Sequence, residues 1–542
     1  MELTKEQRYQ FLLVFLSVIF LIIYNFNNIT VWWPKWMQFE HLIFNWPDAT
    51  ANHFFASSYA NTRLLFVYEP LNLITNNLLH ARSVNVLEGS LVPMAFLPSI
   101  VVFSLFYKIL GAYGVLFITP LMAMFSAWLV YRLVLYLFKD LDIAFISTLL
   151  FLSLAPWVFF ANVVMVPTVM FVFLVLGGWW AIVKSFKSKH ELWWILGSFL
   201  LSLAVVVRPT EVVWLALISL FVLYIKRDIL SAKKIVFGLL VLVAVLFGFF
   251  SLNKATYGGY FTFGYLNLQS GQVDSEIQLQ SRGIFSYIKL LIAPFGFNFV
   301  LILKNFYKYY IDIILPHFVL AVAGFVLLIS KYKKRSLAWK KYLLISPFIF
   351  ILILLYYASW NLADPLVKEL NTISISYVRY FMPLYIWILP LVALAIKELF
   401  MGSSTTNKIA SYVVVSIIVV SSLKLAFMSE HDGLLENRKT LNNYYAQYER
   451  VSSLVEDDAV IISERSDKVF FPKYRVIAFQ GDLPLWERVK NIVDVVPVYY
   501  YSNESEEKIQ VDRQAANELN LDLAEPSQIW DNFILYKVQK MP

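Results

Sequence analysis

The sequence predicts an all-α polytopic membrane protein with about eleven spans and a small C-terminal α/β domain outside the membrane. Of its 542 residues, 59% are hydrophobic and only 15% are charged, whereas soluble globular chains carry about 25% charged residues. So few charges cannot cover a soluble fold of this size, so lipid must be the solvent for much of the chain. Apolar runs recur over residues 1–427, and charged residues become frequent again over residues 428–542.

The rest of the composition narrows the classes of function. Aromatic residues make up 17% of the chain, which is typical of a protein with many interfacial belts. The net charge of +8 fits lysines and arginines gathered on the cytoplasmic side of a membrane. The absence of cysteine excludes disulfides, thiolate catalysis, iron–sulfur clusters and cysteine-ligated zinc.

Eleven apolar runs are candidates for membrane spans, since a helix of about 20 apolar residues crosses the hydrocarbon core. A further apolar stretch, residues 92–110, contains Pro93 and Pro98, so it could either cross or lie re-entrant at the surface. The eleven runs are residues 11–28, 113–137, 142–161, 167–183, 192–207, 211–225, 235–251, 311–330, 342–358, 379–396 and 408–427.

The distribution of lysine and arginine orients these spans. If the N-terminus is cytoplasmic and 92–110 does not cross, the cation clusters within 184–189, 226–234 and 331–341 all fall on the cytoplasmic side. If 92–110 crossed, the first two clusters would face outward, against the positive-inside rule. We therefore expect eleven spans with 92–110 at the outer interface, and twelve spans are the alternative.

This orientation places the longest connections outside the cytoplasm. The outer face receives the loops 29–111 and 252–310, together with residues 428–542 after the last span. In this last segment, short apolar runs alternate with a helical stretch over 441–455, which predicts a compact α/β domain. Long ordered loops usually carry function, so we expect the chemistry of this protein on its outer face.

Several kinds of catalytic centre are absent from the sequence. There is no P-loop, no GxGxxG after a strand, no HExxH and no GxSxG. The six histidines lack the spacing of metal ligands. Asp140-Leu141-Asp142 has the spelling of a DxD metal motif, but it lies beside Lys139 at a cytoplasmic span end, where charged residues are expected. An activated substrate must therefore supply the energy of any reaction.

The first outer loop contains the most informative acid of the chain. Asp48 follows Trp46-Pro47 and precedes a predicted helix over 49–59. Its carboxylate could cap that helix, since an Asp after a turn proline satisfies free N–H groups. It could also serve as a general base, because a capping carboxylate is held rigid and ionised. Glu69 and Glu88 are further acids of the same loop.

Three patterns in this loop resemble the C-type glycosyltransferases: Pro47-Asp48-x-x-Ala51-Asn52, Tyr68-Glu69-Pro70 and Ala81-Arg82-Ser83. The resemblance is to the dolichyl-phosphate-mannose–protein mannosyltransferases (glycosyltransferase family 39) and the bacterial aminoarabinose transferases. Two later stretches extend it, namely Tyr257-Gly258-Gly259-Tyr260 with Phe263-Gly264-Tyr265, and Ser376-Tyr377-Val378-Arg379-Tyr380-Phe381-Met382-Pro383. The chain departs from the family at two acidic positions, since Ala49 replaces the usual Glu and the segment 162–167 contains no acid.

The resemblance implies an inverting transfer of a sugar from a polyprenyl-phosphate donor to a protein, lipid or glycan acceptor, in the cell membrane and on its outer face. It implies Asp48 as the catalytic base, with Glu69 as the second candidate. It implies no metal, since arginines can stabilise a monophosphate leaving group. The donor phosphate is expected at Arg82, Arg208, Arg379 and Tyr380, and the sugar or acceptor at Tyr257, Gly258 and Tyr265.

Some of these residues have simpler explanations, and other functions are open. Arg208 interrupts an apolar run before a proline and could simply snorkel to the interface. The tyrosines could stack on a sugar or anchor the interfacial belt. A lipid or sugar transporter or flippase would require ionisable residues at mid-depth, broken helices or an internal repeat. A non-catalytic glycosyltransferase-like protein would explain the two missing acids.

Overall fold

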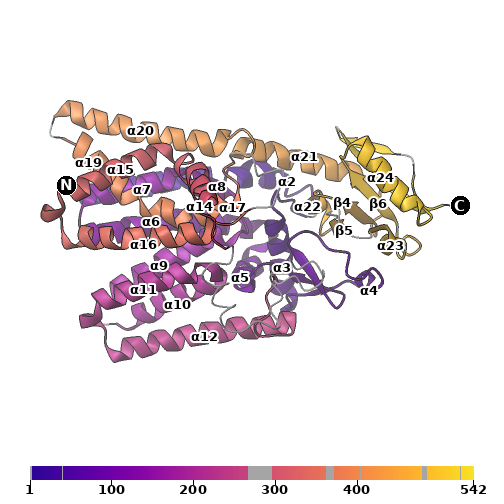
Figure 1. Cartoon of the computed structure of the whole chain (residues 1–542), viewed down its shortest axis with the longest axis horizontal. Coiled ribbons are helices and arrows are strands. Elements are labelled where there is room, and N and C mark those ends of the chain that lie inside the picture. Colours follow the sequence, from indigo (N-terminus) through magenta and orange to yellow (C-terminus); the bar gives the residue numbers. More distant parts are fainter. Residues whose placement is uncertain are drawn as a thin grey trace. The chain divides into compact units, whose positions relative to one another are not determined.

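The computed structural model describes residues 3–39, 41–188, 190–265, 296–361, 372–402, 404–478, 485–524, 526–530 and 532–541 (Figure 1). Two compact units make up the chain, each considered over its described residues. The helical unit comprises Met1–Asn28, Phe117–Phe247 and Leu279–Glu436. The mixed unit comprises Ile29–Leu116, Gly248–Gln278 and Asn437–Pro542. Residues 266–295 and 362–371 of the expected outer loops lie outside the described part of the chain.

The helical unit consists of apolar helices that pack side by side, as α6, α7 and α9 do in Figure 1. In the described part of the chain, seven helices are long and apolar enough to cross a membrane, or up to ten if each bent pair forms one span. The protein is therefore a multi-pass membrane protein, as expected, and the count of eleven spans stays a prediction. The helices are α1 (Lys5–Tyr24), α6 (Ile118–Phe138), α7 (Leu141–Ser153), α8 (Ala155–Asn162), α9 (Pro167–Ser185), α10 (Leu192–Val207), α11 (Val212–Ile225), α12 (Ala232–Tyr257, which continues into the mixed unit), α14 (Phe299–Phe306), α15 (Leu315–Ser330), α16 (Leu337–Tyr357), α17 (Ser376–Tyr380), α18 (Met382–Trp387), α19 (Leu389–Phe400) and α20 (Thr405–Met428).

Prolines break the helical unit at defined places. Helices α7 and α8 meet at 50°, and α10 meets the segment Pro209–Ile225 at 114°. Because proline lacks an N–H group and restricts the residue before it, a helix ends there and a new one starts. The second break leaves Arg208 at the C-cap of α10. Helix α14 lies in a stretch that the sequence assigned to a loop, because eight residues are too few to be recognised as a span.

The DxD-like motif joins three helices at one end of the helical unit. Asp140 caps α7 by accepting from the N–H groups of Asp142 and Ile143. Lys397 of α19 lies 2.6 Å from Asp140 Oδ2, and Lys5 of α1 lies 2.7 Å from Asp142 Oδ1. Both carboxylates are thus engaged with lysines and backbone, which supports the interpretation as span-end charges.

The first outer loop forms an ordered half of the mixed unit. Pro98 lies in the first turn of α5, so the stretch 92–110 becomes a strand end followed by a helix. Helix α5 packs on α3, where the Ser57 hydroxyl donates to the Tyr107 hydroxyl at 3.0 Å and His53 donates to the Ala112 carbonyl at 3.2 Å. The elements are α2 (Trp33–Lys35), α3 (Pro47–Thr62), α4 (Leu71–Ile74), α5 (Leu97–Gly114) and the antiparallel strands β1 (Val67–Tyr68), β3 (Ser90–Pro93) and β2 (Val84–Leu87), paired in that order.

The C-terminal residues form the expected α/β structure. Strand β4 pairs in parallel with β5 and β6, and β9 pairs antiparallel with β6, β7 and β8. Parallel neighbours need crossover connections, which explains the short helices between the strands. The elements are α21 (Leu434–Ser452), β4 (Val460–Ser463), α22 (Asp467–Phe470), β5 (Arg475–Ala478), α23 (Leu485–Val489), β6 (Val498–Ser502), α24 (Glu506–Asn517), β7 (Leu521–Leu523), β8 (Ser527–Trp530) and β9 (Phe533–Lys540).

The first outer loop and the C-terminal sheet share one hydrophobic core. Leu71, Leu78 and Leu79 of the loop are buried in the same cluster as the apolar residues of the sheet. His80 forms a parallel bridge with Ile477 on β5, and its carbonyl accepts from the Ala478 N–H group at 3.2 Å. The loop thus extends the sheet beyond β5, and within this unit the residues from Asn437 onward pack together with the first outer loop.

Two half-buried histidines of the mixed unit, His53 and His80, predict a loss of stability in mild acid. Burial lowers the pKa of His53 from 6.5 to about 4, and burial also lowers the pKa of His80. As the pH falls below 6.5, the unfolded chain binds a proton that the folded protein refuses, so stability decreases toward pH 4. We expect the unfolding temperature of purified protein to fall between pH 7 and pH 5. His53→Gln keeps an N–H donor and cannot titrate, so its unfolding temperature should fall less. An equal fall in both proteins would contradict this assignment.

Candidate functional site

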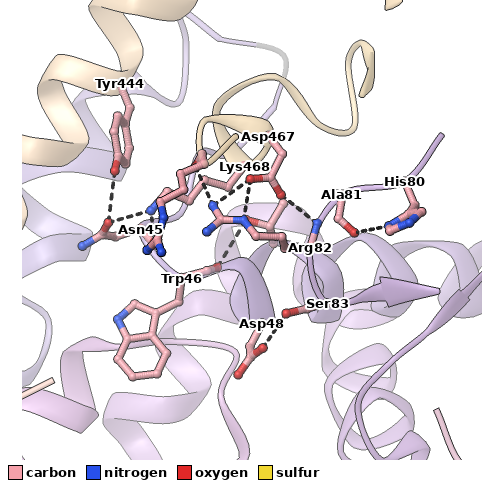
Figure 2. A network of polar contacts seen from close by, with 12 residues as sticks. Asn45, Trp46, Asp48, His80, Ala81, Arg82, Ser83, Tyr444, Asp467 and Lys468 are labelled. Atoms are coloured by element: carbon pink, nitrogen blue, oxygen red, sulfur yellow. Dashed lines mark hydrogen bonds and ion pairs between the residues drawn. The ribbon is translucent and has the colours of Figure 1, made fainter. Parts of the chain in front are cut away.

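Asp48 lies in the first turn of α3, in the mixed unit. The N-cap of this helix is Trp46 and Pro47 opens it, so the expectation that Asp48 is the capping residue is wrong. The helix starts two residues earlier than predicted, at Pro47, because the fixed φ of proline suits the first helical position. The Asp48 carboxylate is half-buried, and the Ser83 hydroxyl donates to its Oδ1 at 2.6 Å (Figure 2). A carboxylate in the first turn is still favoured by the helix dipole.

The predicted phosphate ligand Arg82 is bound to a buried acid of the same unit. Its backbone N–H donates to Asp467 Oδ2 at 2.7 Å, and its Nε donates to Asp467 Oδ1 at 2.8 Å. Its Nη2 lies 2.7 Å from Asp467 Oδ1 and also donates to the Arg465 carbonyl. The Asp467 side chain has no exposed surface. The fork of Arg82 is therefore directed at protein oxygens (Figure 2).

Glu69 is also ion-paired within the mixed unit. Arg475 Nε donates to Glu69 Oε2 at 3.0 Å, and Leu71 N–H donates to Glu69 Oε1 at 3.2 Å. Glu69, His80 and Arg475 line a cavity of about 470 Å³. Among the described residues, no three histidine, aspartate or glutamate side chains form a group that could hold a metal ion.

The Gly/Tyr segment after α12 packs on the first outer loop, again within the mixed unit. Tyr257 is buried and its hydroxyl donates to the Pro93 carbonyl at 2.8 Å. Gly258 follows with a φ of 80°, a conformation that favours glycine and ends the helix. Tyr265 is half-exposed, and its ring centroid lies 5.0 Å from that of Phe96. Of the two predicted tyrosines, only Tyr265 keeps an exposed ring.

A buried ion pair lies at the break between α10 and α11, in the helical unit. Arg208 Nη2 lies 2.9 Å from Glu211 Oε1, and the two side chains are 7% and 0% exposed. The Trp214 indole N–H donates to Glu211 Oε2. Arg208 Nη1 is buried and makes no hydrogen bond within the described part of the chain. Sequence reasoning found Arg208 and missed Glu211, although an acid three residues after an arginine at a proline turn is a readable signal.

Tyr380 brings the two predicted phosphate-binding arginines of the helical unit together. The guanidinium carbons of Arg208 and Arg379 each lie 5.2 Å from the centre of the Tyr380 ring. The ring stacks on Tyr357, with centroids 4.4 Å apart and planes inclined by 2°. Arg208 is also 5.3 Å from the Phe171 ring. Aromatic faces stabilise guanidinium groups and hold them in place, so this cluster is a preformed cationic site.

An apolar cavity of about 340 Å³ lies within the helical unit. Its lining includes Phe171 and Trp214, which contact Arg208 and Glu211, and it follows α11 as far as Lys226. Lys226 and Lys341 also line this cavity. Both belong to the cation clusters that the sequence predicts on the cytoplasmic side of the membrane. Most of the wall is aliphatic, with side chains from α6, α9, α11, α16 and α18, such as Val130, Val175, Ile218, Ile345 and Ile386.

Comparison with known proteins supports the fold. No family model and no curated protein sequence matches the chain. The crystal structure of ArnT from Cupriavidus metallidurans in its apo state is similar over 98% of both chains, with a TM-score of 0.51 and 10% identity. The oligosaccharyltransferase of Archaeoglobus fulgidus aligns with 90% of this chain and 69% of its own, with a TM-score of 0.49 and 12% identity. The chain therefore has the fold of ArnT, which confirms the resemblance to aminoarabinose transferases at the level of fold.

The Arg208–Glu211 pair makes a prediction about stability. Glu211→Gln leaves Arg208 buried without its counter-charge, and breaking a buried ion pair typically costs about 3–5 kcal/mol. We expect a clearly lower unfolding temperature for this variant in detergent. The double variant Arg208→Gln/Glu211→Gln removes both charges and should recover part of the loss. A double variant less stable than both single variants would show that the ion pair does not couple these residues.

Proposed function

We propose that the protein is an inverting glycosyltransferase that moves a sugar from a polyprenyl-phosphate donor to an acceptor hydroxyl or phosphate. The observation that carries this proposal is the pair of arginines, Arg208 and Arg379, around the Tyr380 ring. An apolar cavity lies beside them, since its lining rings Phe171 and Trp214 contact the Arg208–Glu211 pair. A cationic site beside an apolar cavity is complementary to the head and tail of an anionic lipid. The similarity of the fold to that of ArnT supports assigning this lipid chemistry to a glycosyltransferase.

The donor phosphate is assigned to the helical unit. The buried Nη1 of Arg208 can donate to a phosphate oxygen, while Glu211 holds the other side of the guanidinium. Arg379 supplies the second guanidinium, and two planar forks suit the oxygens of a leaving phosphate. We do not assign this task to Arg82, because its fork is directed at Asp467 and Arg465. The isoprene units of the carrier would occupy the apolar cavity between Trp214 and Lys226.

The catalytic base is assigned to the mixed unit. In this mechanism, Asp48 takes the proton of the acceptor hydroxyl as its oxygen attacks the anomeric carbon. The bond from that carbon to the phosphate oxygen breaks on the opposite face, so the configuration inverts and the polyprenyl phosphate leaves with the electron pair. Glu69 is a weaker candidate, because both of its oxygens already accept hydrogen bonds. The exposed ring of Tyr265 remains the candidate for stacking on a sugar.

One departure from the family favours a second function. Ala49 stands where relatives carry a glutamate, which suits a glycosyltransferase-like protein that binds a lipid phosphate without catalysis. A transporter of lipid or sugar would also need the cationic site, and it would move its cargo without forming a glycosidic bond. Both alternatives predict that Asp48 can be replaced without loss of function.

Asp48→Asn tests the enzyme directly. The amide keeps the shape and the acceptor for Ser83 but cannot take a proton, so we expect kcat to fall by about 10²–10⁴-fold. The readout is free polyprenyl phosphate released from a panel of polyprenyl-phosphate sugars, measured by mass spectrometry. Glu88→Gln changes an exposed acid of the same loop and is the matched control. Wild-type turnover by Asp48→Asn would remove Asp48 from the mechanism.

Arg379→Lys provides the contrasting variant in the same assay. Lysine keeps the charge but loses the planar fork and its stacking on Tyr380, so donor binding should weaken. We expect the KM for the donor to rise while Asp48→Asn leaves that KM near the wild-type value. A raised donor KM in both variants, with unchanged kcat, would contradict the division between phosphate binding and base.

We also propose that the N-terminus is cytoplasmic and that the C-terminal domain is extracytoplasmic, because of the cation asymmetry of the loops. The chain contains no cysteine, so single introduced cysteines report their side cleanly. Glu507→Cys in α24 should be labelled by an impermeant maleimide from the outside of intact cells, and Lys333→Cys only after the cells are opened. The reverse pattern would place the C-terminal domain in the cytoplasm.

A further inference from the structure

The short helix α22 contacts the chain on both sides of Asp48 in sequence. Asp467 binds the backbone and side chain of Arg82, and the neighbouring Lys468 Nζ donates to the Asn45 carbonyl at 2.6 Å (Figure 2). Lys468 also lies 5.0 Å from the centre of the Tyr444 ring of α21. The C-terminal domain thus binds two segments of the first outer loop, one just before Asp48 and one that carries Ser83.

The turn at Ser83 has an unfavourable backbone conformation. Its φ is 64°, in the left-handed region that a non-glycine residue other than Asn or Asp seldom adopts. Such a conformation is energetically unfavourable and persists only where its surroundings hold it. The residue before it, Arg82, is held by Asp467 through its backbone N–H, its Nε and its Nη2. The ion pair is therefore in the right place to maintain the turn.

This turn determines the position of the Ser83 hydroxyl. The hydroxyl donates to Asp48 Oδ1 at 2.6 Å, which is a short, charge-assisted hydrogen bond. A donor at that oxygen restricts the rotation of the carboxylate and so fixes its orientation. In Figure 2 the connection runs from Asp467 through Arg82 to the adjacent Ser83 and from there to Asp48.

The platform behind Asp467 is rigid. Asp467 follows β4, a fully buried strand that pairs with both β5 and β6. The loop residue His80, two positions before Arg82, forms a bridge with β5 of the same sheet. The Arg82–Asp467 contact is therefore supported by the sheet from both partners, and side chains on such elements hold a geometry better than side chains on free loops.

We propose that the C-terminal domain is a positioning device for the acid of the first outer loop. Asp467 and Arg82 hold the Ser83 turn, and Ser83 orients the Asp48 carboxylate. Asp467, Arg82 and Ser83 are positioning residues, since none of them needs to touch the substrate. This inference rests on the proposed role of Asp48 as the base, and it assigns a task to the C-terminal domain and to Arg82 that the proposed function leaves open.

A double-mutant cycle on Asp467 and Ser83 tests the inference in the full-length protein. Asp467→Asn removes the charge that holds Arg82, and we expect kcat to fall by about 10- to 100-fold with the KM for the donor unchanged. Ser83→Ala removes the hydroxyl and should lower kcat by a smaller factor. Because both substitutions act through the Asp48 carboxylate, the kcat of the double variant should be close to that of Asp467→Asn alone. It should not fall by the product of the two separate factors. Neither change should lower kcat further in the Asp48→Asn background.

Asp512→Asn is the matched control. Asp512 is a buried carboxylate of the same domain, and it accepts from the Tyr500 hydroxyl at 2.7 Å within the C-terminal core. This variant perturbs the domain without touching the loop, so its kcat should stay near that of the wild type. If Asp512→Asn lowers kcat as much as Asp467→Asn does, the loss in both variants comes from general destabilisation of the domain. That result would overturn the inference.

Hydrogen–deuterium exchange separates the inference from the proposed function. Asp467→Asn should raise deuterium uptake in peptides covering residues 81–84, since the Arg82 N–H loses its acceptor, and Asp512→Asn should not. Unchanged uptake in Asp467→Asn would overturn the inference that Asp467 and Arg82 hold the Ser83 turn, whatever the role of Asp48. If Asp48→Asn is fully active, the proposed base is wrong, and the exchange result still decides whether Asp467 holds this turn. If Asp48→Asn is inactive and Asp467→Asn keeps wild-type kcat, only the positioning role is overturned.

Discussion

A charged side chain that is buried away from water needs a partner of opposite charge. Both units meet this constraint with a buried ion pair. Arg208 and Glu211 are nearly free of solvent in a bundle of apolar helices, where either charge alone would be costly. Asp467 is equally buried in the mixed unit and is paired with Arg82. The helix break at Pro209 and the left-handed turn at Ser83 both lie next to these pairs. Each of these two irregular backbone segments therefore has a buried ion pair beside it.

The arginines of these two pairs, Arg208 and Arg82, differ in how many of their N–H donors are bound to protein groups. Arg208 has one buried N–H group without an acceptor in the described part of the chain, between two aromatic rings. The N–H groups of Arg82 point to Asp467 and to the Arg465 carbonyl. An arginine whose Nε and Nη2 are already bound to protein oxygens contributes rigidity, whereas one with a spare donor can receive an anion from outside. The same residue type is thus engaged by protein partners in one unit and, in the proposed function, binds the donor phosphate in the other.

Much of the fold was predictable because lipid imposes a simple rule on composition. Runs such as 167–183 and 192–207 correspond closely to α9 and α10, since only a helix satisfies its backbone in hydrocarbon. The alternating pattern after residue 428 likewise became a sheet with helices. The short α14 was missed, because eight residues carry too little periodicity to be recognised within a loop. The grouping of the C-terminal residues with the first outer loop was also missed, since no local pattern reports a bridge such as that of His80 with Ile477.

The sequence by itself determined the membrane class, the helical character of the spans, and the residue types available for phosphate and proton chemistry, because hydropathy and side-chain chemistry are local properties. Tertiary structure alone decided which protein groups surround each of these residues. Arg379 and Arg208, far apart in sequence, share the Tyr380 ring, while Arg82 is held by an acid 385 positions later in the chain. Glu211 gained its importance in the same way, through burial beside Arg208. Such pairings depend on long-range packing, and packing has no signature in a single stretch of sequence.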